Sequence, residues 1–185
     1  MMGKKFLEID DKHIAFINAQ KMFFVGSATA DSRINISPKG LDSLRVLDKH
    51  RVVWLNLTGS GNETAAHMQS DNRMTIMFCA FEGNPKILRL YGTAQTIHVG
   101  DEGWDELYAL FEPLPGARQI FEMHVDLVHT SCGFGVPLYD FVGQREMLNE
   151  WAERKERTTG IQHYWKDKNS ISLDGERIHI PEDKA

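Results

Sequence analysis

The chain has few of the residues that define several large protein classes. Its 185 residues include only two cysteines and no stretch of eighteen consecutive apolar residues. Cys79 and Cys132 lie far apart, one in a predicted strand and one beside a glycine turn, so we expect two free thiols and no disulfide framework. The missing apolar run argues against a membrane-spanning helix, and residues 1–10 have no apolar core of signal-peptide length. We therefore expect a cytoplasmic protein.

Positive charge is also scarce. The chain has 21 lysines and arginines against 26 acidic residues, which gives a net charge of -5 and an isoelectric point near 5.9. A nucleic-acid-binding surface requires clustered positive charge, and no such cluster is present. We expect no nucleic-acid partner and no membrane partner. A hydrophobic content of 42% is enough for one globular domain with a terminal extension.

Hydrophobic patterning predicts a mainly β protein with some helix. Short connections between the apolar runs favour antiparallel hairpins, and hence a small antiparallel barrel. The chain after Ser170 is polar and is expected to be a loosely held tail. The predicted strands cover residues 22–29, 34–37 (ending at Pro38), 44–47, 51–57, 74–81, 86–97 and 120–131. The predicted helices cover residues 11–20, 101–111, 144–156 and 161–168.

The strand over 51–57 runs into a glycine-rich turn and then a short helix. Gly59 and Gly61 permit positive φ angles there, so that backbone N–H groups can converge on a phosphate. Three side chains would add hydrogen bonds to it: Ser60, Asn62 and Thr64. The segment is not a P-loop, which needs Gly-Lys-Ser/Thr, and it lacks the third glycine of a dinucleotide-binding turn. In the simpler alternative, Asn62 or Thr64 only caps the helix.

Six separated motifs follow one another along the chain: Phe23–Ala30, Asn35–Gly40, Gly59–His67, Phe78–Gly83, Leu88–Gly92 and Ser131–Pro137. Together they resemble one family, the pyridoxamine 5'-phosphate oxidase-related, FMN-binding split-barrel family. The resemblance runs from the first predicted strand to Pro137. It divides the chain into a split-barrel domain, 1–137, and a helical C-terminal extension, 138–185, packed on the barrel or on a dimer partner.

The resemblance implies a homodimer of split β-barrels with FMN bound in the grooves between subunits. Ser37 and Lys39 would contact the phosphate or the edge of the isoalloxazine, and the strand end Asn56, Leu57 and Thr58 would lie along the flavin. The phosphate pocket would comprise Ser60, Asn62, Glu63 and Thr64, with Glu63 contributing only its backbone. His67 would contact the phosphate or the flavin rim, and Arg89 would reach the cofactor across the dimer.

The chain also departs from the family pattern. Pyridoxamine phosphate oxidases proper hold the FMN phosphate with a Ser-Arg-Lys turn, where this chain has Asn62-Glu63-Thr64. Their C-terminal basic and aromatic substrate residues have no match here, so we do not predict pyridoxal phosphate synthesis. Lys39 and His67 each have a simpler interpretation as solvated surface residues.

The resemblance therefore predicts a flavin-dependent oxidoreductase that acts on an unknown small molecule, with no catalytic residue assigned. One alternative is a non-catalytic flavin or haem carrier or redox sensor, and another is a deazaflavin-dependent reductase on the same fold. No metal site is predicted, because the eight histidines fall in no recognisable ligand motif. His124 and His129 lie an odd number of positions apart in one predicted strand, and so would face opposite sides of it.

Overall fold

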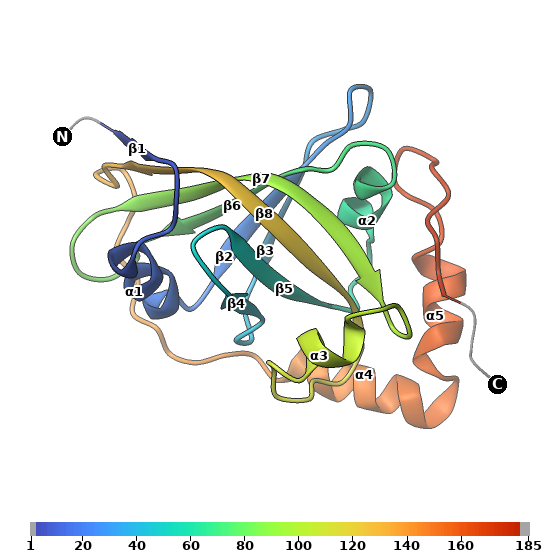
Figure 1. Cartoon of the computed structure of the whole chain (residues 1–185). Helices are drawn as coiled ribbons and strands as arrows, with labels where there is room; N and C mark the ends of the chain where they lie inside the picture. Colours follow the sequence, from blue (N-terminus) through green and yellow to red (C-terminus); the bar gives the residue numbers. More distant parts are fainter. Residues whose placement is uncertain (1–2, 182–185) are drawn as a thin grey trace.

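The chain folds around one curled antiparallel sheet (Figure 1). The computed structural model describes residues 3–181. The strand order is β3-β2-β6-β7-β8-β5-β4, with β1 paired to β8, and the sheet forms a half-barrel. The antiparallel split barrel expected from the sequence is thereby confirmed. The strands are β1 (Lys4–Phe6), β2 (Phe23–Ser27), β3 (Asn35–Lys39), β4 (Leu44–Val46), β5 (Arg51–Leu57), β6 (Arg73–Cys79), β7 (Ile87–His98) and β8 (Ala117–Ser131).

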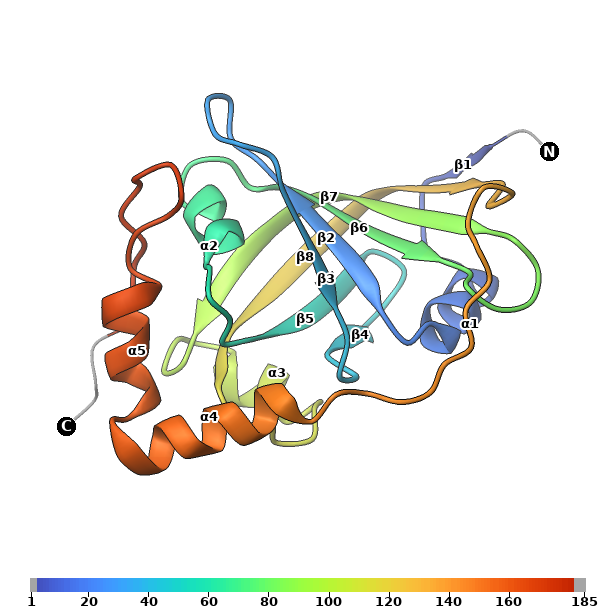
Figure 2. The same ribbon diagram turned by 180° about the vertical axis from the view of Figure 1, so that it is seen from behind.

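Among the described residues, five helices surround the sheet. Helix α1 lies near one end of the barrel and α2 near the other, and α4 and α5 form the helical C-terminal extension (Figures 1 and 2). The segment between β8 and α4 passes along the outside of the barrel, below α1 (Figure 2). Within residues 3–181, no helix has the length and apolar character needed to cross a membrane. The helices are α1 (Asp11–Ala19), α2 (Glu63–Met68), α3 (Trp104–Tyr108), α4 (Met147–Thr158) and α5 (Ile161–Lys168).

Strand β5 is buried on both faces, which explains its continuous apolar run. Val52 and Trp54 belong to the main core inside the curled sheet, whereas Val53 and Leu55 pack on the other face. That second face is covered by α3 through residues such as Trp104. Side chains alternate between the two faces of a strand, so a strand sandwiched in this way must be apolar throughout.

Two predictions about the strands are wrong. We expected the second strand to break at Pro38, but β3 continues through it to Lys39. Strand β3 is an edge strand, where the missing N–H of proline can face away from the ladder. We also expected His124 and His129 to face opposite sides of β8. A β-bulge leaves Asp126 without a partner on β7 and reverses the alternation, so both histidines lie on the side away from the main core.

The prediction of a loose tail after Ser170 is also wrong for the described residues, which end at 181; residues 182–185 lie outside them. Ile178 is 6% exposed and belongs to the main core. Gln69, beside α2, accepts a hydrogen bond from the backbone N–H of His179 and donates one to the carbonyl of Arg177, both at 2.8 Å. The polar composition hid this docking, because hydrogen bonds to distant residues contribute to it along with the burial of Ile178.

The C-terminal helices pack directly on the backbone at Gly116, just before β8. Gly116 has a φ of 74°, and a Cβ there would lie 2.9 Å from Ala152 Cβ and 3.1 Å from Ile161 Cδ1. Ala152 on α4 and Ile161 on α5 are both buried. Only glycine permits both this backbone conformation and this close approach.

We predict that Gly116→Ala lowers the free energy of unfolding by about 2–4 kcal/mol, because strain at positive φ is added to a steric overlap. Gly175→Ala is the matched control, since its φ is 89° but no atom lies within 4 Å of the added Cβ. Its expected loss is about 1 kcal/mol. Urea denaturation measures both, and equal losses would contradict direct packing of the extension at Gly116.

Candidate functional site

Most of the predicted site residues gather at one end of the barrel, where β5, the glycine loop and α2 follow one another. Asn56 and Leu57 end β5, residues 58–62 form the loop, and α2 begins at Glu63. The edge strand β3 contributes Ser37 and Lys39. Neighbouring strands of the sheet are antiparallel, so residues that are far apart in the sequence lie close together at this end of the fold.

A hydrogen-bonded network joins α2 to β2 and β3. Thr64 Oγ1 accepts from Ser27 Oγ at 3.3 Å and from Asn35 Nδ2 at 3.1 Å. His67 Nδ1 lies 2.9 Å from the same Ser27 hydroxyl, and Ser37 Oγ donates to Asn35 Oδ1 at 3.2 Å. The network therefore brings together three predicted residues, Ser37, Thr64 and His67. His67 is 4% exposed, so it is not a surface residue in this chain.

The glycine loop differs from the predicted conformation. Among the described residues, the glycines with positive φ do not include Gly59 or Gly61, so the prediction of left-handed backbone there is wrong. The loop carbonyls instead bind side chains from distant segments. Asn169 Nδ2 lies 3.1 Å from the Gly59 carbonyl oxygen and 3.3 Å from that of Ser60, and Arg118 Nη2 donates to the Gly61 carbonyl at 3.1 Å.

Asn62 and Thr58 are hydrogen-bonded within the protein. Asn62 precedes α2 but its side chain makes no capping hydrogen bond. It accepts from Gln119 Nε2 at 2.8 Å and donates to the Asn169 carbonyl at 3.4 Å. Thr58 Oγ1 donates to the Gly116 carbonyl and accepts from Trp165 Nε1, both at 2.7 Å. These two side chains therefore support the loop from inside.

The remaining loop residues have different surroundings. The Glu63 carboxylate accepts the Leu173 backbone N–H at 3.0 and 3.2 Å, so its side chain is occupied by the C-terminal segment. Ser60 is exposed, Asn56 is buried opposite Gln119 of β8, and Leu57 is half-buried. The side chain free to meet a ligand at the loop is thus Ser60.

Arg89 lies apart from the others. It sits near the start of β7, opposite Met77 and His129, and its Nη1 donates to Ser131 Oγ at 3.2 Å. The opposite end of β7 is the one near the glycine loop. Its last residue, His98, pairs with Gln119, whose side chain binds Asn62. Within one chain, the structure does not bring Arg89 to the loop.

Two desolvated cations, Lys39 and Arg118, define the electrostatics of this end of the barrel. Lys39 Nζ lies 4.9 Å from the centroid of the Trp54 ring, and burial, aided by the charge of Arg118, lowers the pKa of Lys39 to about 8. Arg118 is 3% exposed, and burial lowers its pKa to about 10. Neither cation pairs with a carboxylate among residues 3–181. Neither positive charge is therefore neutralised by direct contact with a carboxylate in the described part of the chain.

The sequence interpretation missed several residues of this site, among them Asn35, Arg118, Asn169 and Trp165. Asn35 carried a usable signal, since Asn35, Ser37 and Lys39 alternate along one strand and so share a face. Arg118 carried none, because nothing in the local sequence shows that it is buried. Asn169 and Trp165 were assigned only to a helical extension, and their contacts depend on how that extension docks.

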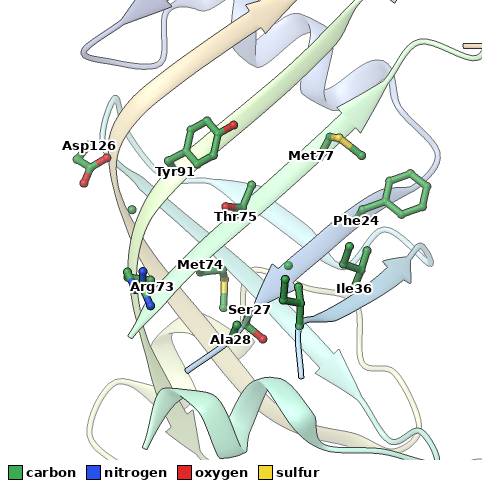
Figure 3. A pocket seen from close by; sticks show the side chains of 13 residues that line it. Phe24, Ser27, Ala28, Ile36, Arg73, Met74, Thr75, Met77, Tyr91 and Asp126 are labelled. Atoms are coloured by element: carbon green, nitrogen blue, oxygen red, sulfur yellow. The ribbon is translucent and has the colours of Figure 1, made fainter. Parts of the chain in front are cut away.

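A groove of about 580 Å³ lies on the outer face of β2, β3, β6 and β7 (Figure 3). Phe24, Met77 and Tyr91 line it, with Arg73 and Asp126 toward one end (Figure 3). At its margin the apolar side chains are uncovered: Ile34 is 75% and Ile36 67% exposed. Contiguous exposed apolar surface of this kind is typical of an interaction surface.

These features define a split-barrel protein of the flavin-binding fold type, and the sequence comparison assigns its family. The sequence pattern of the family described as pyridoxamine 5'-phosphate oxidase matches residues 9–132, so the chain belongs to that family. The pyridoxamine 5'-phosphate oxidase family protein ustO of Aspergillus flavus is 37% identical over 174 residues, which cover 84% of this chain and 70% of the relative.

Solved structures agree with the fold. A single-residue variant of HupZ from Group A Streptococcus matches with a TM-score of 0.54 and 19% identity, over 66% of this chain and 99% of that one. A putative pyridoxamine 5'-phosphate oxidase from Lactobacillus delbrueckii matches with a TM-score of 0.54 and 15% identity, over 69% and 98%. At these identities the similarity shows the fold alone.

We predict that the half-buried charge of Lys39 makes stability depend on pH. Its pKa is about 8 in the folded chain against an ordinary 10.5, so the unfolded state binds more protons between these values. The free energy of unfolding should rise between pH 8 and 10.5, by roughly 1–3 kcal/mol.

The Lys39→Met variant should lack this rise in the free energy of unfolding. All other titratable groups are the same in the variant and in the wild type, so the difference between the two proteins isolates Lys39. Urea denaturation of both proteins at pH 7.0, 8.5 and 10.0, conditions within about two units of the shifted pKa, measures the difference. A difference that does not change with pH would contradict the desolvation of Lys39.

Proposed function

We propose that this chain binds FMN and acts as a flavin-dependent oxidoreductase on a small molecule. Membership of the pyridoxamine 5'-phosphate oxidase family supports the proposal. The observation that carries it is Lys39, a desolvated cation with no carboxylate partner among the described residues. A buried charge of this kind is stabilised when an anionic ligand binds.

The residues present fit an anionic cofactor. Lys39 supplies the charge, Ser60 offers an exposed hydroxyl, and the Thr64–His67 network holds the adjacent side chains in place. The Glu63 carboxylate is held by the backbone N–H of Leu173, which leaves the backbone of Glu63 for the ligand. This agrees with the role expected of Glu63 from the family resemblance.

The other assignments follow from the same resemblance. Backbone groups of Asn56, Leu57 and Thr58 would bind the pyrimidine ring, and Lys39 would stabilise negative charge on the ring or on the phosphate. When bound, FMN supplies hydride chemistry, and the protein supplies orientation and electrostatics. Arg89 would contribute from the partner subunit, in accord with its distance from the loop of its own chain.

A homodimer is part of the proposal. The groove shown in Figure 3, together with exposed Ile34 and Ile36, offers an apolar surface for a second copy of the chain. Burying such a surface is favourable by about 25 cal/mol per Å² of apolar area before the costs of association.

The first experiment is a titration of the purified protein with FMN. We expect the flavin absorption near ~450 nm to become structured and its fluorescence to be quenched. Lys39→Met should weaken FMN binding by about tenfold or more, since a charge-assisted hydrogen bond is lost. Lys12→Met, at an exposed position of α1, is the matched control and should bind FMN normally.

Other outcomes of this titration select the alternatives. A Soret band in the purified protein would indicate a haem carrier, and binding of a deazaflavin in preference to FMN would indicate a deazaflavin-dependent reductase. A flavin that binds but is not turned over with any electron donor would indicate a carrier or sensor. A colourless protein that ignores FMN would refute the proposed function.

We predict that Ile36→Asp converts a dimer into a monomer, because it places a charge in the proposed interface. Ile36 is 67% exposed in the single chain, so the fold should be unaffected. Sedimentation velocity measures the change, and Leu7→Asp, at a site 78% exposed on another part of the surface, should remain dimeric. A wild-type chain that sediments as a monomer at micromolar concentration would refute the homodimer.

A further inference from the structure

The glycine loop contains no cation, although its proposed ligand is a phosphate. Neither the loop, residues 58–62, nor the residues Glu63 and Thr64 that follow it include a lysine or an arginine. A phosphate monoester bound only by neutral groups and Lys39 would lack the charge-assisted hydrogen bonds that give such sites their strength. A second cation would therefore have to reach the loop from another segment of the chain.

Arg118 reaches the loop from β8 because of a β-bulge. Asn56 pairs with Gln119 and Leu57 with Ala117, which leaves Arg118 as the extra residue between them. Bulges redirect side chains in this way. The guanidinium of Arg118 is directed to the loop, where its Nη2 donates to the Gly61 carbonyl at 3.1 Å.

Arg118 retains unused hydrogen-bonding capacity. Arg118 is only 3% exposed, and its buried Nε has no hydrogen-bond partner among the described residues. A buried donor without a partner is costly, and it is rare in proteins unless a ligand, ion or water completes the site. The Nε–H can therefore donate to an anion while Nη2 keeps its contact to Gly61.

Asn169 fixes the position of Arg118. It is fully buried, and its Oδ1 accepts from Arg118 Nη1 at 2.6 Å, while its Nδ2 lies within 3.3 Å of the Gly59 and Ser60 carbonyl oxygens. The side-chain amide of Asn169 thus links Arg118 to the carbonyl groups of Gly59 and Ser60. Asn169 follows α5, so this link comes from the C-terminal extension.

The chemistry of Asn169 also matters. An amide oxygen orients the guanidinium but carries no charge, whereas an aspartate would neutralise it. Arg118 is near enough to Lys39 for its charge to lower the pKa of that lysine, and neither has a carboxylate partner in residues 3–181. Two like charges in a desolvated site favour an anion that interacts with both.

We propose that Arg118 is the second cation of the phosphate site and that Asn169 is the residue that positions it. The C-terminal extension is then part of the cofactor site. This inference rests on the proposed FMN function for the identity of the ligand, and its ligand chemistry is that of a phosphate monoester.

The test compares Asn169→Asp with the wild-type chain. The substitution keeps the size of the side chain and the acceptor for Arg118, but its charge neutralises the guanidinium. It also removes the Nδ2 donor to the Gly59 and Ser60 carbonyls, a loss that it shares with Asn169→Ala. Asn169→Ala, which removes the acceptor without adding charge, is the second variant. Asn18→Asp is the matched control, because it makes the same chemical change at an exposed position of α1.

Affinities for FMN and for riboflavin, which lacks the phosphate, are measured by fluorescence quenching. We expect Asn169→Asp to weaken FMN by about tenfold or more and riboflavin by less than about twofold. Asn169→Ala should show a smaller loss with the same selectivity, and Asn18→Asp none. If FMN and riboflavin weaken equally, or if neither changes, the proposal is overturned, because Asn169 then has at most a structural role.

A second measurement separates this proposal from the proposed function. The melting temperature of the chain without flavin is compared in inorganic phosphate and in sodium chloride of equal ionic strength. We expect phosphate to raise the melting temperature of the wild type and of Asn18→Asp, but not of Asn169→Asp. If neither flavin binds and this pattern holds, the flavin function fails and the anion site stands. An equal response of all three proteins would overturn the anion site.

Discussion

The hydrogen bond between Arg118 and Asn169 joins the three parts of this molecule. Arg118 belongs to the sheet, Asn169 follows the last helix, and both bind carbonyls of the glycine loop. An arginine that is only 3% exposed would be costly without such partners, because its charge has lost its hydration. The conformation of the loop and the docking of the extension therefore depend on the same buried contact.

The antiparallel sheet makes this contact possible. Strands β5 and β8 are neighbours, so the end of β5 lies beside the start of β8, and the bulge at Arg118 turns that side chain toward the loop. Gly116, two residues earlier, lets α4 and α5 approach the backbone closely. A larger residue at Gly116 would displace Ala152 and Ile161, and with them the segment that carries Asn169.

Local patterns predicted much of the fold and part of the site. Alternation of apolar residues identified the strands, and the glycine loop between β5 and α2 was recognised as the centre of the site. Errors occurred where tertiary context overrode a local preference. Pro38 continues a strand because that strand is at the edge, and Gly59 and Gly61 do not take the left-handed conformation that glycine permits. The described part of the polar tail, up to residue 181, docks on the fold because Gln69, beside α2, provides hydrogen-bonding partners that the tail's own sequence does not reveal.

The sequence by itself determined which segments become strands and helices, because side-chain periodicity and turn residues act over a few positions. It also determined the family, because the motifs recur in a fixed order. Only the tertiary structure decided which polar residues meet. Arg118 lies 51 positions from Asn169 and 57 from Gly61 along the chain. Their contact requires a strand pairing, a bulge and a docked helix, and the burial that gives Arg118 and Lys39 their electrostatic character exists only once these are formed.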